Sequence, residues 1–132
     1  MKGYVNNIEE LTIANSNFRK VLYTGKHSQL VLMTLQPGEE IGLEVHPDND
    51  QFFRIEKGTA KIIIDGNHYE ASDGFAIVVP AGAQHNVINT SSTATMHLYT
   101  IYSPPHHKDQ IARITKNDAI THEAEYDGAT SE

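Results

Sequence analysis

The chain has 132 residues, of which 39% are hydrophobic and none is cysteine. This length suits one domain with a single core, and the lack of cysteine excludes disulfides, a thiolate nucleophile and Cys-bound zinc. The net charge of −7, without a basic cluster, disfavours nucleic acid as a partner because like charges repel a phosphate backbone.

Short β-rich runs separated by turn residues follow one another along most of the chain. Strands are predicted at residues 18–25, 28–35, 41–46, 51–58, 60–64, 67–71, 75–79, 85–89 and 94–102. The Asp65-Gly66 dipeptide predicts a tight hairpin between the fifth and sixth of these runs. Turns spaced by about 8–12 residues are typical of a β-sandwich or a small barrel.

The C-terminal part differs in character from the strands. Tandem prolines within residues 103–107 predict irregular backbone, since proline fixes φ and removes a hydrogen-bond donor. Only residues 115–125 are predicted to be helical, with Thr115 as the N-cap. Residues 126–132 are expected to fray. No linker or repeat divides the chain, which predicts one all-β domain over residues 1–132 with a short C-terminal helix.

No run approaches the roughly 20 apolar residues of a membrane-spanning helix, so no membrane partner is expected. No apolar signal-peptide core follows the first methionine. Together with the lack of cysteine, this favours the cytoplasm.

Two segments carry distinctive residues at regular spacing. Residues 38–58 read GEEIGLEVHPDNDQFFRIEKG, and residues 74–89 read GFAIVVPAGAQHNVIN. They resemble the paired motifs of the cupin superfamily. The second segment matches every fixed position of its motif, namely Gly74, Pro80, Gly82, His85 and Asn89. The first keeps the spacing, but Glu44 stands in place of the first histidine and Gln51 in place of the glutamate.

The resemblance is to small single-domain cupins, of the kind loosely called mannose-6-phosphate isomerase-like. It implies a jelly-roll β-barrel or sandwich with one metal site inside, whose ligands would be Glu44, His46, Gln51 and His85. Alternate residues of a strand share a face, so Glu44 and His46 point the same way, and an inward carboxylate needs a partner such as a cation.

Asp50 is an alternative to Gln51, because the family tolerates a shorter gap at this point and a carboxylate binds a metal better than an amide does. Gln51 is preferred, since it keeps the spacing of the motif to Gly58 and shares strand parity with Phe53.

The expected ligand set narrows the chemistry without choosing the metal. Two imidazoles and one carboxylate are the ligands of non-haem iron(II) oxygenases, and the same set accepts zinc, nickel, manganese or cobalt. One divalent transition metal is therefore expected. Phe53, Tyr102 and His107 are the candidate residues of a substrate pocket, although for His107 a solvent-exposed loop position is the more strongly favoured alternative.

The resemblance implies a metal-binding cupin that acts on a small oxygen-containing molecule, as an isomerase or a dioxygenase type of enzyme. A non-catalytic module that binds or senses a small molecule is the alternative, because no general acid or base stands out beyond the ligands. The motifs supply few cations, which disfavours a phosphorylated substrate. A homodimer that uses the N-terminal strands, around residues 18–25, is expected because an open sandwich has edge strands to cover.

Overall fold

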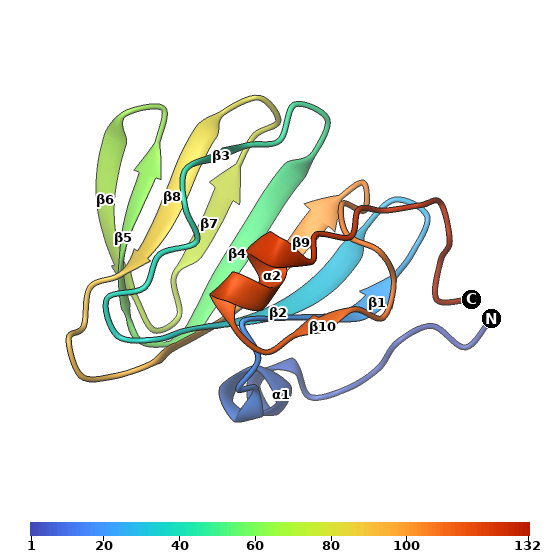
Figure 1. The fold of residues 1–132 in the computed structure, drawn as a ribbon, viewed down its shortest axis with the longest axis horizontal. Coiled ribbons are helices and arrows are strands. Elements are labelled where there is room, and N and C mark those ends of the chain that lie inside the picture. Colours follow the sequence, from blue (N-terminus) through green and yellow to red (C-terminus); the bar gives the residue numbers. More distant parts are fainter.

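The computed structural model describes all 132 residues, and its strands form two antiparallel sheets that pack against each other (Figure 1). The large sheet has six strands in the order β10-β1-β2-β9-β4-β7, and the small sheet has four in the order β3-β8-β5-β6. The elements are α1 (Ile8–Ala14), β1 (Arg19–Thr24), β2 (Gln29–Leu35), β3 (Glu44–Val45), β4 (Asp50–Lys57), β5 (Thr59–Ile64), β6 (Asn67–Ser72), β7 (Ala76–Val79), β8 (Gln84–Asn89), β9 (Met96–Ser103), β10 (Ala112–Arg113) and α2 (Lys116–Thr121).

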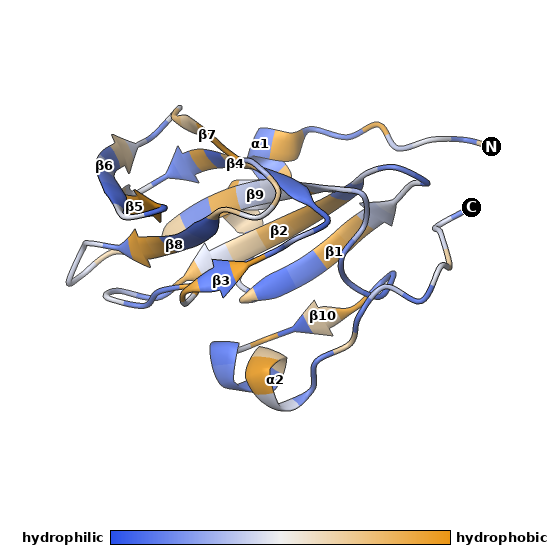
Figure 2. Ribbon diagram, turned by 90° about the horizontal axis from the view of Figure 1, so that it is seen from above, coloured by the Kyte–Doolittle hydropathy of each residue, from blue (hydrophilic) through white to orange (hydrophobic).

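Strand alternation builds one core between the two sheets. Along β9 every second side chain is buried, from Met96 to Tyr102, and β4 buries Gln51, Phe53 and Ile55 in the same way. β2 lies between β1 and β9 and is buried along almost its whole length. Its ribbon has hydrophobic colours along much of this length (Figure 2). This confirms the predicted all-β sandwich and the inward direction of Phe53 and Tyr102.

The predicted strands are all present, but the third is much shorter than expected. Residues 41–46 were predicted to be one strand, and only Glu44–Val45 pair with a neighbour. Gly42, with φ +107, interrupts the extended backbone before them, and Pro47, which has no N–H to donate, follows. The Asp65-Gly66 hairpin is confirmed, because both residues have positive φ and Ile64 pairs with Asn67.

The helix α1 was not predicted, so the expectation of a single helix near the C-terminus is wrong. The side chain of Asn7 accepts a hydrogen bond from the backbone N–H of Glu10 and caps this short helix. Thr12 is fully buried. With only seven residues, α1 depends on packing against the large sheet rather than on intrinsic helix stability. The predicted C-terminal helix is present but covers only Lys116–Thr121 of the expected residues 115–125, and Thr115 is its N-cap, forming a capping box with Asp118.

The C-terminal tail does not fray as expected. The backbone N–H of Ser131 donates to the carbonyl oxygen of Thr24 at 2.9 Å, and the Thr24 N–H donates to the Ser131 hydroxyl. β10 pairs with the other end of β1 at Arg19 and Lys20. The outer edge of β1 is therefore covered by this chain's own C-terminal part, and β1 is not the free edge strand on which the expected dimer contact rested.

Neither helix is long and apolar enough to cross a membrane.

Gly58 allows the tight connection between β4 and β5. Its φ is +128, and a Cβ placed there would lie 2.7 Å from Cγ and 3.1 Å from Cα of Met96. We expect Gly58→Ala to lower the free energy of unfolding by about 2–4 kcal/mol, since both backbone strain and overpacking contribute. Gly38→Ala is the matched control, because Gly38 also has positive φ but open space around it. Equal losses for the two variants in urea unfolding would contradict the steric account.

Candidate metal centre

Strand pairing brings together three of the four predicted ligands. β3 pairs with β8 so that Glu44 lies opposite His85, and His46 follows directly after β3. One potential ligand atom from each of these residues lies within 4.8 Å of the others. Oε2 of Glu44 is 2.9 Å from Nε2 of His46, and the rings of His46 and His85 have centroids 5.2 Å apart. The cluster has the donor types and the spacing that could hold a metal ion.

The backbone holds the two motifs against each other at this point. The N–H of Gly82 donates to the carbonyl oxygen of His46 at 3.0 Å, and the N–H of Ala83 closes the turn onto Pro80. Gly82 has φ +88, which favours glycine. The turn of the second motif is thereby fastened to the end of β3, and it delivers His85 to the cluster.

Gln51 lies on the inward face of β4. It is 2% exposed, and its Nε2 donates to the hydroxyl of Thr100 at 3.0 Å. Phe53, on the same face of β4, has its ring centroid 6.2 Å from that of His85. The inward row of β4 therefore faces β8 across the core, and Gln51 lies at the end of that row next to the β7–β8 turn, since it pairs with Val79, the last residue of β7.

Asp50, the alternative to Gln51 as a metal ligand, lies outside the site. Its side chain is exposed, and its Oδ1 accepts a hydrogen bond from the backbone N–H of Ala81 at 2.9 Å. Neighbouring residues of a strand point to opposite faces, so the inward position of Gln51 excludes Asp50 from the interior. Asp50 stabilises the turn that precedes His85.

Two buried atoms of the site lack any hydrogen-bond partner: Oε1 of Gln51 and Nε2 of His85. Leaving such atoms unpaired costs about 1–3 kcal/mol each, so native structures rarely contain them. Nδ1 of His85 lies 3.2 Å from the carbonyl oxygen of Ala83, which favours the tautomer with the proton on Nδ1 and a free lone pair on Nε2. An amide oxygen and an imidazole nitrogen with free lone pairs are suitable metal ligands.

The electrostatics of the cluster favour the states in which its residues can bind a metal. Burial lowers the pKa of His85, so its ring is neutral at neutral pH. Burial alone would raise the pKa of Glu44, but the hydrogen bond with His46 and the nearby charges of His46 and Arg19 lower it overall. His85 therefore presents a neutral imidazole and Glu44 an ionised carboxylate, the states that metal binding requires of these two residues.

Three ring side chains from the end of β9 and the segment after it surround the cluster. The centroid of His106 is 4.3 Å from that of His46, and the Tyr102 ring stacks on His106. Nε2 of His107 is 3.2 Å from the Tyr102 hydroxyl. His107 is buried, so the alternative of a solvent-exposed loop position is wrong. Burial raises the pKa of Tyr102, and burial together with the charge of Arg19 lowers the pKa of His107.

His106 was not predicted as a site residue. The sequence places it after two prolines, where periodicity gives no direction for a side chain. The structure fixes this segment through Asn49, whose Nδ2 donates to the carbonyl oxygen of Pro104 at 2.5 Å. The contact joins the loop after His46 to the loop before His106, and so brings the two histidines together.

A small cavity of about 100 Å³ opens beside the cluster, lined by Arg19, Glu44, His106, His107, Glu123, Ala124 and Glu125. Residues 123–125 reach it because the backbone of residues 106–108 hydrogen-bonds to residues 124–126, with Lys108 donating to Ala124 and Tyr126 to His106 at 3.0 Å each. Nε of Arg19 is buried and has no partner. The expectation of few cations was based on the two motifs, and Arg19, which lies outside both motifs, adds one cation to the wall of the cavity.

The chain is similar to several known proteins. The uncharacterized protein YrkC of Bacillus subtilis (strain 168) is 47% identical over 128 residues, which cover 92% of this chain and 68% of YrkC. Protein L612 of Acanthamoeba polyphaga mimivirus, also uncharacterized, is 50% identical over 108 residues, which cover 79% of this chain and 67% of L612. The crystal structure of BH2720 from Bacillus halodurans superposes with a TM-score of 0.89 at 41% identity, covering 92% of this chain and 96% of that one.

The family comparison agrees with the two sequence motifs. The Cupin_2 family, described as a cupin domain, matches residues 31–102, which run from β2 to β9 and include both motifs. The strands that supply Glu44, Gln51 and His85 all lie inside this range. The chain therefore belongs to the cupin family.

Proposed function

We propose that Glu44, His46, Gln51 and His85 bind one divalent transition metal, and that this centre acts on a small oxygen-containing molecule held in the adjoining cavity. The observation that carries the proposal is the unpartnered buried Nε2 of His85 in the cluster with Glu44 and His46, and the buried Oε1 of Gln51, also without a partner, supports it. One ion would give both atoms a partner and would neutralise the Glu44 carboxylate in the interior.

The ligand set suits iron, zinc, nickel, manganese or cobalt. When bound, such an ion supplies Lewis-acid polarisation of a substrate oxygen, or dioxygen activation if it is iron. An isomerase or an oxygenase type of reaction follows from these two kinds of chemistry.

The protein residues around the cavity would bind and orient the substrate. Arg19 lines the cavity, and its guanidinium group would donate a hydrogen bond to an oxygen of the substrate. A cavity of about 100 Å³ admits a molecule of the volume of about three waters, so the substrate must be small or must enter only in part. Glu123, Ala124 and Glu125 form one wall of the cavity.

One observation favours the alternative of a non-catalytic module that binds or senses a small molecule. Tyr102 and His107 hydrogen-bond to each other, and burial moves the pKa of each away from neutrality. Neither group is poised for proton transfer near pH 7. Turnover assays of the metal-loaded protein with dioxygen and with a panel of small sugars and hydroxy acids distinguish an enzyme from a binding module.

The role of Gln51 can be tested separately from that of the histidines. We expect Gln51→Glu to bind the metal more tightly, by about tenfold or more, because it places a second carboxylate beside Glu44, and a tenfold change corresponds to about 1.4 kcal/mol. The measurement is a competition titration against a chelator. Asp50→Asn is the matched control and should leave affinity unchanged, since Asp50 points outwards onto the turn. Unchanged affinity and unchanged metal-site spectra in Gln51→Glu would remove Gln51 from the ligand set.

A further inference from the structure

The small sheet ends in an edge strand that nothing in the chain covers. β6 is the last strand in the order β3-β8-β5-β6, and its residues 67–70 are all exposed (Figure 1). It contains no proline, lysine or arginine, the residues with which proteins commonly prevent edge strands from pairing. The edge of the large sheet at β1 is, in contrast, covered by β10 and the C-terminal tail.

The hairpin geometry determines which backbone groups of β6 face outwards. Asp65 and Gly66 have φ +46 and +78, as in a type I′ turn, so Ile64 and Asn67 form the hydrogen-bonded pair that closes the hairpin. By alternation, Tyr69 also bonds to β5, whereas His68 and Glu70 direct their N–H and C=O groups to the free edge. The contact between the hairpin and β8 agrees with this alternation, because the N–H of Asp65 donates to the carbonyl oxygen of Gln84 in β8.

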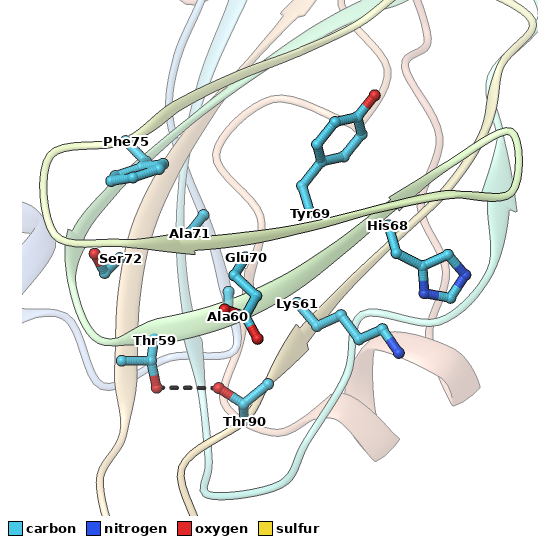
Figure 3. A pocket seen from close by; sticks show the side chains of 10 residues that line it. All are labelled: Thr59, Ala60, Lys61, His68, Tyr69, Glu70, Ala71, Ser72, Phe75 and Thr90. Atoms are coloured by element: carbon cyan, nitrogen blue, oxygen red, sulfur yellow. Dashed lines mark hydrogen bonds between the residues drawn. The ribbon is translucent and has the colours of Figure 1, made fainter.

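Apolar side chains accompany the free edge. Tyr69, Phe75 and Val78 are 54%, 49% and 65% exposed. They line an apolar groove of about 350 Å³ that lies between β6 and β7, the edge strands of the two sheets. Tyr69 points to one side of β6, whereas His68 and Glu70 point to the other (Figure 3). The strand therefore offers a hydrogen-bonding edge, an apolar face and a charged face together.

We propose that β6 pairs antiparallel with β6 of a second copy of this chain, about a two-fold axis at Tyr69. In this register His68 of each copy lies opposite Glu70 of the other, and each such pair exchanges two backbone hydrogen bonds. The two small sheets would join into one continuous sheet. The tyrosines meet at the axis, where side chains of a non-hydrogen-bonded pair lie closest, and they cover the apolar groove.

The side chains of His68 and Glu70 favour this strand register over the two adjacent symmetric registers. A two-fold axis at Glu70 would place the two Glu70 carboxylates opposite each other. A two-fold axis at His68 would place the two histidines opposite each other. Glu70 would then lie opposite Gly66 of the other copy, outside its β6. The axis at Tyr69 pairs His68 with Glu70 twice and uses every outward N–H and C=O of both residues. A symmetric, self-complementary edge of this kind fits a second copy of the chain rather than an unrelated partner.

A single cysteine tests the register, because the chain has none of its own. Residues of a non-hydrogen-bonded antiparallel pair have Cα atoms about 4.5 Å apart, within the range of about 4.4–6.8 Å that a disulfide requires. We expect Tyr69→Cys to form a covalent dimer under mild oxidation. Asn67→Cys is the control: it is exposed on the same strand but would lie about 13 Å from its symmetry mate, at about 3.3 Å per residue, and should stay uncrosslinked.

A second variant tests the backbone contacts. Glu70→Pro removes an N–H that faces outwards and not towards β5, so the fold and its thermal midpoint should persist while the dimer dissociates. Light scattering at micromolar concentration should give a dimer for the wild type and a monomer for Glu70→Pro. A wild-type monomer, a dimer that survives in Glu70→Pro, or equal crosslinking of the two cysteine variants would each overturn the proposal. These outcomes do not depend on metal.

Discussion

Replacing His85 with alanine is expected to abolish stoichiometric metal binding. His85 is 2% exposed, and its Nε2 has no partner within the protein. It lies opposite Glu44 across the β3–β8 pair, so its loss removes the side of the cluster that the second motif supplies. A site reduced to Glu44, His46 and Gln51 would retain one imidazole. We expect affinity to fall by at least a hundredfold, which corresponds to about 2.8 kcal/mol.

The measurement is metal content after dialysis, followed by titration of the apo-protein. His27→Ala is the matched control, because His27 is exposed and lies outside both motifs. It should retain full stoichiometry. Circular dichroism and thermal unfolding of the His85→Ala apo-protein establish that the fold persists. Full retention of metal by folded His85→Ala would sink the assignment of this residue.

Replacing Phe53 with alanine is expected to be among the most destabilising single changes in the core. Phe53 is fully buried on the inward face of β4, and its ring packs beside that of His85. Truncation of a buried phenylalanine typically costs about 3–5 kcal/mol, through lost burial and the cavity that remains. The His85 ring also loses a neighbour that restricts it, so metal affinity should fall as well, by less than in His85→Ala.

Phe52→Ala provides the comparison for this change. Phe52 is next in the chain but lies on the other face of β4, where it is only partly buried and has its ring 6.2 Å from that of Tyr99. Urea unfolding should show a clearly larger loss for Phe53→Ala than for Phe52→Ala. Similar losses would mean that the alternation of β4 does not determine where the core lies.

Much of this arrangement could be predicted from the sequence because it depends on local rules. The positions of β4 and β9 follow from alternation, and the β5–β6 hairpin follows from Asp65-Gly66. The resemblance of the two segments to the cupin motifs predicted that Glu44, His46 and His85 belong to one site, and the structure brings these three residues together.

The parts that could not be predicted depend on contacts between distant segments. α1 is too short to be distinguished by periodicity, and β10 has two residues and exists only as a partner of β1. The C-terminal tail has a composition typical of a frayed end, yet it hydrogen-bonds to β1. The periodicity of a sequence predicts whether a segment is a helix or a strand, but it does not predict which distant segment it packs against.

The residues that line the cavity also could not be predicted, because their positions depend on contacts between distant segments. Arg19 and His106 reach the cavity from β1 and from the loop after β9, and neither residue belongs to a motif. Their placement requires the β1–β2 pairing and the bonds from Asn49 to the proline segment. The two motifs therefore indicate the residues of the cluster but not the residues that would contact a substrate.

Elemental analysis of the wild-type protein, purified without an affinity metal, tests the central claim most directly. The Glu44–His46 pair and the unpartnered atoms of Gln51 and His85 predict about one divalent transition metal per chain, either as purified or after titration of the apo-protein. That ion should disappear on dialysis against a chelator and return on reconstitution. A folded protein that contains no such metal, and that takes up none when iron, zinc, nickel, manganese and cobalt are each titrated in, would contradict the account.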